Sequence, residues 1–271
     1  MNLGQLPKSR RNFRLLRSTV NSLAGKSVLV TGGHKRLGRA IALHLARHGA
    51  DIVISWRRDP DQAQETLALL HQTGVRASAF ACDLTASAQI EALVANAVAF
   101  LGRLDGVVAS AASFVPTGVD ATSLAQLPMI MAANATGPLQ LALAASTQLT
   151  RCGDGRLVLV GDMAGTRPLR GYLGHSMAKA ALHNAVMGLA AELAPSIVVN
   201  CVAPGAVLRP VEHSEEQWRK LVARNPLGAL ALRDEQLPIA AVAAAVEFFL
   251  ACPPYITGQT LHVDGGRTAV W

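Results

Sequence analysis

Aromatic residues and cysteines are scarce in this chain. Phe, Trp and Tyr make up 4% of the 271 residues, and only four cysteines are present. The cysteines lie far apart and form no CxxC pair, which argues against both a zinc knuckle and a disulfide framework. They are Cys82, Cys152, Cys201 and Cys252. We therefore expect reduced thiols, no metal site and a cytoplasmic location.

Long continuous apolar runs are also absent. No run approaches the roughly 20 apolar residues that a membrane span requires. Hydrophobic residues nevertheless make up 51% of the chain, against 16% charged residues. This balance predicts a soluble domain with a large buried core and no transmembrane segment.

Acidic residues are missing from the first 50 positions, which carry ten lysines and arginines. The other 221 residues hold 15 basic and 18 acidic side chains, so the formal charge of +7 resides in the N-terminal part. We assign residues 1–24 to a basic N-terminal extension. It is either a tail packed on the domain or on a neighbouring subunit, or a targeting or membrane-surface helix. Nucleic-acid binding is not expected, because no stacking aromatics accompany the arginines.

Short apolar runs alternate with helical segments through residues 25–271, which we assign to one domain. Such alternation predicts parallel strands with right-handed crossovers and a ligand crevice at the strand carboxyl ends. The predicted fold is therefore α/β, a single Rossmann-type doubly wound parallel sheet with helices on both faces. Strands are expected at residues 27–30, 50–56, 76–81, 104–109, 155–160, 197–202 and 261–263, and helices at 39–46, 61–74, 87–101, 124–149 and 175–193.

The segment TGGHKRLG at residues 31–38 turns the first strand into the first helix. Glycines let the backbone pass close under a pyrophosphate, and the N–H groups at a helix start favour an anion. The two cations of the turn add positive charge at the same point. The segment predicts a dinucleotide cradle whose cofactor-binding residues are Thr31, Gly32, His34, Lys35, Arg36 and Leu37.

Arginines at the end of the second strand indicate the cofactor. A chain that binds NAD usually carries an acidic residue there, whereas one that binds NADP supplies arginine. Arg57 and Arg58 occupy this position, and Lys35 is expected beside them, which favours NADP(H). Asp83 and Leu84 follow the third strand, where we expect contact with the adenine. A helix N-cap is the alternative role for Asp83.

Taken together, these segments resemble the short-chain dehydrogenase/reductase family from about residue 25 to residue 266. Further landmarks are Asn134, the helix that carries Lys179, the segment NCVAPG at 200–205 and the segment VDGG at 263–266. The resemblance implies that Ser110, Ala111, Pro204, Gly205 and Lys179 also bind the cofactor. It further implies a homo-oligomer, a dimer or a tetramer.

Within this family the chain is most similar to pteridine and dihydromonapterin reductases. These share the TGxxxRLG pattern, in which Arg36 stands where most relatives have glycine. The segment AASFVPT at 111–117 is similar to their ASSFxPT loop, in which the phenylalanine stacks on the pterin ring. The resemblance thus implies that Ser113, Phe114, Tyr172, Arg209 and Trp218 contact the substrate, and that residues 211–228 form a flap or a subunit contact.

The catalytic motif departs from the family pattern. The family's YxxxK motif places a phenol and an ammonium one helical turn apart, but here His175 replaces the tyrosine and Lys179 remains. Asp162 stands where the subgroup has a catalytic aspartate. An imidazole can donate a hydrogen bond or pass a proton, although it is shorter than a phenol. The implied catalytic residues are Asp162, His175, Lys179 and Asn134.

Three hypotheses about this centre remain open at the level of sequence. The chain is an active reductase, a silent NADP-binding sensor or oligomeric partner, or an enzyme that recruits Tyr172 as its acid. We predict an NADPH-dependent reductase that transfers hydride to a C=N or C=O bond of a small cyclic substrate, a dihydropterin first of all. A carbonyl reductase for another ketone is a further alternative.

Overall fold

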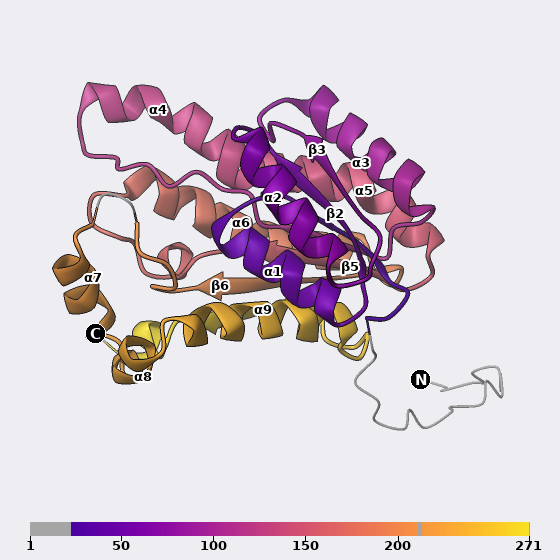
Figure 1. Cartoon of the computed structure of the whole chain (residues 1–271). Helices are drawn as coiled ribbons and strands as arrows, with labels where there is room; N and C mark the ends of the chain where they lie inside the picture. The colour runs from indigo at the N-terminus through magenta and orange to yellow at the C-terminus, as the bar shows by residue number, and fades with distance from the viewer. Residues whose placement is uncertain (1–22, 211–212, 271) are drawn as a thin grey trace, which may run out of the picture.

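A single parallel sheet organises the chain. The computed structural model describes residues 23–210 and 213–270. Within them seven parallel strands are ordered β3-β2-β1-β4-β5-β6-β7, which confirms the predicted fold class (Figure 1). The strands are β1 (Ser27–Val30), β2 (Asp51–Trp56), β3 (Ala77–Ala81), β4 (Gly106–Ala109), β5 (Gly155–Val160), β6 (Ile197–Pro204) and β7 (Thr260–Val263).

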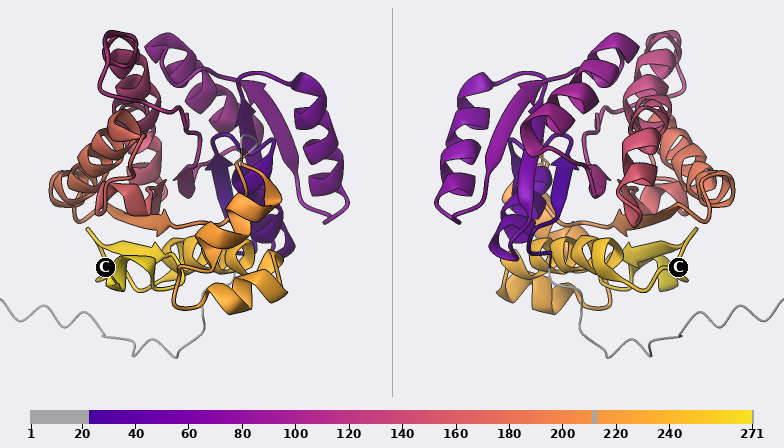
Figure 2. Two further views of the ribbon diagram at one scale, coloured as in Figure 1. Left: turned by 90° about the vertical axis from the view of Figure 1, so that its left-hand side faces the viewer. Right: turned by 90° about the vertical axis from the view of Figure 1, so that its right-hand side faces the viewer.

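Alternate residues of each strand face two different helix layers. Val28 and Val30 of β1 pack in the cluster formed with α1, α2 and α9, whereas Leu29 between them packs in the cluster formed with α3, α5 and α6. Figure 2 shows helices on both sides of the sheet. A strand buried on both faces must be apolar at successive positions, which explains the short continuous runs of the sequence. The helices are α1 (Arg36–Arg47), α2 (Pro60–His71), α3 (Ser87–Leu101), α5 (Gly137–Arg151), α6 (Leu173–Glu192) and α9 (Gln236–Ala251).

The helix predicted at 124–149 is interrupted. The structure instead has α4 (Ala121–Met131), a π-helical turn (Ala132–Thr136) and α5. Pro138 has no N–H, so the carbonyl of Asn134 loses its helical donor four residues later. Gly137 also packs tightly, since a Cβ atom there would lie 2.4 Å from the Leu84 carbonyl oxygen. These two residues account for the break, which places Asn134 in a widened turn.

The prediction omitted α9, although its buried residues have helical spacing. Val242, Val246, Phe249 and Leu250 are buried against β5 and β6. The segment predicted as a flap contains α7 (Glu215–Val222), which begins with a Ser214 and Gln217 capping box, and precedes α8 (Gly228–Arg233). Residues 211–212 of that segment lie outside the described residues. Figure 1 shows α7 beyond the carboxyl end of β6.

Most of the predicted basic extension lies outside the described residues. Leu23, which the prediction placed in it, is 2% exposed and packs in the cluster of α1, α2 and α9. In the described part of the chain, no helix has both the length and the apolar character needed to cross a membrane.

Because Leu23 is in the core, a chain that begins at Ser22 should retain the sheet. We expect it to unfold cooperatively, with a Tm within a few degrees of that of the full chain, and to bind NADPH with the same affinity. Thermal unfolding followed by circular dichroism measures the first property, and calorimetric titration the second. Insoluble truncated protein would show that residues 1–21 are part of the folded assembly.

Candidate active site

The turn between β1 and α1 has the close backbone packing that a dinucleotide requires. Arg36 has φ 50°, a left-handed value that favours glycine, which explains why a glycine is usual here in the resembled family. A Cβ atom on Gly38 would lie 2.2 Å from the Gly32 carbonyl oxygen, so only glycine lets the helix start under the turn. Lys35 provides no side-chain cap, and the first turn of α1 holds no acidic residue. The helix start therefore suits an anion such as a pyrophosphate.

Thr31 and His34 hold this turn to its neighbours. Thr31 Oγ1 accepts hydrogen bonds from the backbone N–H groups of Ser110 and Ala111 at 3.1 and 3.2 Å. The His34 carbonyl accepts from Thr66 Oγ1 at 2.7 Å, while neither ring nitrogen of His34 has a hydrogen-bond partner among the described residues. Burial and the Lys35 charge lower the pKa of His34 below its usual value. A neutral ring is therefore available beside the cradle.

The rim of the cradle carries three cations and two carboxylates. Lys35 Nζ lies 2.6 Å from Asp59 Oδ2, and Arg57 lies 3.7 Å from Asp83 Oδ2. The hydrogen bond from Lys35 keeps the pKa of Asp59 below its usual range. Arg58 is exposed and forms no ion pair within 4 Å among the residues described here. Asp83 also accepts from the N–H and hydroxyl groups of Thr85.

His175 and Asp162 face one another at the centre of the site. His175 Nε2 lies 3.2 Å from Asp162 Oδ2, and His175 Nδ1 lies 3.2 Å from the Ser113 carbonyl oxygen. The side chain of Asp162 is 24% exposed and that of His175 only 3%. Asp162 also accepts from the N–H of Ala164 at 2.7 Å, so the aspartate both caps a turn and binds the imidazole. Of these two side chains, the Asp162 carboxylate is therefore the one accessible from the surface of the site.

Asn134 acts on this pair through the 111–117 loop. Its Oδ1 accepts from the Ser113 N–H at 3.1 Å, and its Nδ2 donates to Ser113 Oγ at 2.9 Å and to the Ile130 carbonyl. Asn134 is fully buried. The Ser113 carbonyl is also the partner of His175 Nδ1. Asn134 in the π-helical turn therefore fixes the position of Ser113, and Ser113 in turn orients the imidazole.

Lys179 lies one turn after His175 on α6. It is 3% exposed, and its ammonium donates to the Val160 carbonyl oxygen at 2.7 Å. Burial lowers the pKa of Lys179 below its ordinary value, and the Asp162 carboxylate partly offsets that effect. The lysine thus supplies positive charge behind the pair.

Phe114 packs on the imidazole of His175, and Tyr172 stacks on Phe114. The rings of Phe114 and Tyr172 have centroids 4.2 Å apart, and the Phe114 ring meets the His175 ring edge-on at 4.9 Å. Phe114 is 41% exposed, so one side of it is accessible. Thr117, which the prediction did not assign to the site, fixes the loop by donating its N–H to Gly171 and accepting from Gly174.

A pocket of about 330 Å³ lies beside this aromatic pair. It is lined by the 117–124 segment, by Leu127 of α4, and by Leu173 and Gly174 at the start of α6. Its lining is mainly apolar.

The remaining predicted residues occupy the two flanks of the site. Leu84 is buried in the cluster formed with α3, α5 and α6, and Leu37 of the cradle is half-buried against the cluster formed with α1, α2 and α9. Gly205 donates to the Val263 carbonyl directly after Pro204 ends β6. The Arg209 carbonyl accepts from Arg36 at 3.0 Å, which joins the glycine turn to the segment before α7. Trp218 is half-buried on α7, and no contact described here connects it to His175.

His183, which the prediction missed, lies one turn beyond Lys179. A Cβ atom added to Gly161 would lie 2.4 Å from its Nε2, so the glycine makes room for the ring. Burial and the charges of His262 and Lys179 lower the pKa of His183 to about 4. Its position four residues after the lysine on a buried helix face could have identified it.

This low pKa makes stability depend on pH. An unfolded histidine titrates near pH 6.5, so the stability gained from a neutral His183 is complete above that pH and is lost as the pH falls towards 4. We expect the Tm of the wild type to fall by a few degrees more than that of His183→Gln between pH 6.5 and pH 4. Thermal unfolding of both proteins across this range measures the difference. Parallel curves would mean that His183 does not contribute.

Comparison with known proteins places this geometry in a family. Residues 33–268 match the family described as enoyl-(acyl carrier protein) reductase. The chain is 31% identical to glucose 1-dehydrogenase of Gluconobacter oxydans over 90% of this chain and 92% of that protein. It is 30% identical to cyclohexanol dehydrogenase of a Rhodococcus species over 91% of this chain and 97% of that protein.

Among solved structures, the chain is similar to FolM alternative dihydrofolate reductase 1 from Brucella suis, crystallised in complex with NADP. The TM-score is 0.83 at 29% identity, and the match covers 92% of this chain and 97% of that one. Relatives named dehydrogenases and reductases, together with the Rossmann-type sheet, identify an oxidoreductase that binds a nicotinamide cofactor. This chain belongs to the short-chain dehydrogenase/reductase family.

Proposed function

We propose that this protein is an NADPH-dependent reductase of a C=N or C=O bond in a small cyclic substrate, with a dihydropterin as the leading candidate. The observation that carries the proposal is the 3.2 Å contact between His175 Nε2 and Asp162 Oδ2 in a site that also holds Lys179. The NADP-bound relative named dihydrofolate reductase supports the choice of cofactor and of substrate class.

A neutral imidazole and an ionised carboxylate together carry one proton too few to form both hydrogen bonds of His175. The carbonyl facing Nδ1 can only accept, so Nδ1 carries a hydrogen in this arrangement. Nε2 of a neutral ring would then be an acceptor facing a second acceptor, Asp162 Oδ2. A hydrogen bond between them forms when the pair holds one additional proton. We infer that this shared proton is the one delivered to the substrate.

Exposure decides which member of the pair meets the substrate. The Asp162 side chain is the more exposed, whereas the His175 side chain is buried and packs against Phe114. Asp162 is therefore the proton donor at the surface of the site, and His175 holds and returns the proton behind it. NADPH, when bound, supplies the hydride. Lys179 and the cradle at residues 31–38 would hold the cofactor, with Lys179 adding positive charge beside the reacting bond.

The burial of His175 favours a second candidate, a silent NADP-binding homologue. Both ring nitrogens are engaged, and the side chain is only 3% exposed, so the ring has little direct access to a substrate. In this case Asp162 would serve as a turn cap and the protein as a sensor or an oligomeric partner.

A substrate panel distinguishes the two candidates. NADPH oxidation is measured with dihydrobiopterin, dihydrofolate and several simple cyclic ketones, with NADPH affinity determined separately by calorimetry. For a dihydropterin reductase, we expect NADPH oxidation to be faster with a dihydropterin than with the ketones. NADPH binding without oxidation of any substrate supports the silent homologue, and preferred reduction of a ketone supports a carbonyl reductase.

We further infer a cytoplasmic homo-oligomer, a dimer or a tetramer, formed by the domain at residues 25–271. Large apolar side chains are exposed on the neighbouring helices α5 and α6, namely Leu143 at 54%, Met177 at 47% and Met187 at 56%. Three of the four free cysteines are buried, which suits a reducing compartment. Light scattering of the purified chain measures the oligomeric state, and a monomer at micromolar concentration contradicts this inference.

A further inference from the structure

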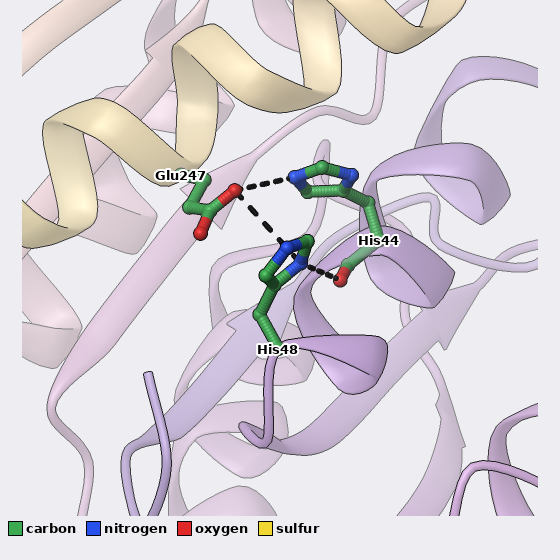
Figure 3. Close-up of side chains that lie close together, drawn as sticks. All are labelled: His44, His48 and Glu247. Carbon is green, nitrogen blue, oxygen red and sulfur yellow. Dashed lines mark hydrogen bonds and ion pairs between the residues drawn. The ribbon is translucent and has the colours of Figure 1, made fainter. Parts of the chain in front are cut away.

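Two histidines and a glutamate meet on the face of the sheet opposite α6, away from His175. His44 and His48 stand four residues apart at the end of α1, and Glu247 lies on α9, which packs against α1. One ligand atom from each residue lies within 4.8 Å of the other two. Figure 3 shows the three side chains pointing toward one another.

We propose that these three residues bind a divalent transition-metal ion of the zinc class. The site contains two imidazole nitrogens and one carboxylate oxygen, which are donors that Zn²⁺ and its neighbours prefer. Histidines at positions i and i+4 of one helix present both rings on the same face, a spacing that suits joint coordination of zinc. The third ligand comes from a different helix, so the ion would join α1 to α9.

The observed distances are close to those of a coordinated set. Ligand bonds of about 2.0–2.1 Å in a tetrahedral site place the ligand atoms roughly 3.3 Å apart. Glu247 Oε2 lies 2.6 Å from His44 Nε2 and 3.8 Å from His48 Nδ1. The first pair must open by several tenths of an ångström and the second must close by a similar amount.

Exposure supplies an entry path and a place for solvent ligands. The His48 side chain is 47% exposed, while those of His44 and Glu247 are 24% and 19% exposed. An ion can therefore reach the site past His48, and water can complete its coordination. His48 Nδ1 donates to the His44 carbonyl oxygen at 2.9 Å, and metal binding through that nitrogen would replace this hydrogen bond.

The alternative to a metal site is a hydrogen-bonded contact that only joins the two helices. The variant His48→Gln separates these roles, because His48 is the most exposed of the three residues and the short contact between His44 and Glu247 remains. Glu247→Gln removes the charged ligand but keeps a side chain able to accept a hydrogen bond from His44. His71→Gln is the matched control, because His71 lies on α2 and its only hydrogen-bond partner within residues 23–210 and 213–270 is the Ala77 carbonyl.

The experiment uses the full chain without a histidine tag. Calorimetric titration with Zn²⁺ should show one high-affinity site that His48→Gln and Glu247→Gln weaken more than roughly tenfold and that His71→Gln leaves unchanged. At about a hundredfold excess of Zn²⁺ over its Kd, the Tm of the wild type should rise by about 5 °C. At the same Zn²⁺ concentration, the His48→Gln protein should show at most about half of that rise.

A Co²⁺ titration gives a readout independent of stability. Coordination by the three residues should produce visible d–d absorption in the wild type and in His71→Gln, but not in His48→Gln. Unchanged Zn²⁺ affinity in His48→Gln would assign the ion to another site, such as Asp162 and His175, and would overturn the proposal. Absence of any Zn²⁺ binding by the wild type would overturn it as well.

Discussion

Replacing His175 with alanine should lower kcat for NADPH oxidation by roughly 10²–10⁴-fold, the loss expected when a proton-transfer group is removed. The substitution removes the partner of Asp162 Oδ2 and the extra proton that the pair shares. It does not touch the cradle at residues 31–38, so NADPH affinity should stay constant. Steady-state kinetics with an established substrate and calorimetric titration with NADPH measure the two quantities.

The control for this variant is His71→Gln, which changes a histidine outside the site. Its kcat should equal that of the wild type. If kcat is also unchanged in His175→Ala, the imidazole takes no part in proton transfer, and Asp162 or water must be the source of the proton.

The variant His175→Tyr restores the YxxxK motif of the family on a helix that already holds Lys179. An enzyme adapted to histidine should gain no activity, because a phenol is longer than the imidazole that packs against Phe114 and Ser113. A silent homologue, by contrast, would acquire reduction of a ketone or a pterin. The two outcomes separate the two candidate functions.

NADPH should bind at least roughly tenfold more tightly than NADH, which is the scale of one charge-assisted contact. Lys35 and Arg57 are already paired with Asp59 and Asp83, so Arg58 is the cation most available to a 2′-phosphate. Arg58→Ala should therefore reduce the NADPH to NADH affinity ratio to a value near one. Lys35→Ala should reduce it less.

Arg151→Ala is the matched control, since Arg151 is exposed at the end of α5, which packs over β4 and β5 and not over the rim of the cradle. It removes the same charge and should leave the ratio unchanged. Equal affinities of the wild type for the two cofactors in calorimetric titration would contradict the assignment of NADP(H).

The central strands were predictable because they are buried on both faces. Such strands need apolar residues at successive positions, and the runs at 27–30 and 155–160 match β1 and β5 without error. The helix break at 132–136 was not predicted, since a single proline at 138 is tolerated in the first turn of a helix as well as in a kink. Gly137 packs tightly against Leu84, and this packing decides whether the proline starts a helix or kinks one. The contact is visible only in the structure.

The grouping of Asp162 with His175 was easier to predict than the other contacts of these two side chains. The sequence indicated Asp162, His175 and Lys179, and the structure brings the first two into contact. The sequence did not indicate that a backbone carbonyl of the 111–117 loop would accept a hydrogen bond from the other imidazole nitrogen. Every residue has a backbone carbonyl, so the residue type does not reveal which one serves as the acceptor. The pairing of Lys35 with Asp59 was equally hidden, since it depends on the left-handed conformation of Asp59 at φ 66°.

The shared proton of Asp162 and His175 is tested most directly by a double-mutant cycle. Asp162→Asn keeps an oxygen that can cap the N–H of Ala164, so it removes the charge while preserving the turn. NADPH oxidation with a dihydropterin is measured for the wild type, Asp162→Asn, His175→Ala and the double variant. If the two residues share one proton, the rate of NADPH oxidation should fall to nearly the same residual value in both single variants and in the double variant. Rate losses that multiply in the double variant, or a single variant as fast as the wild type, would contradict it.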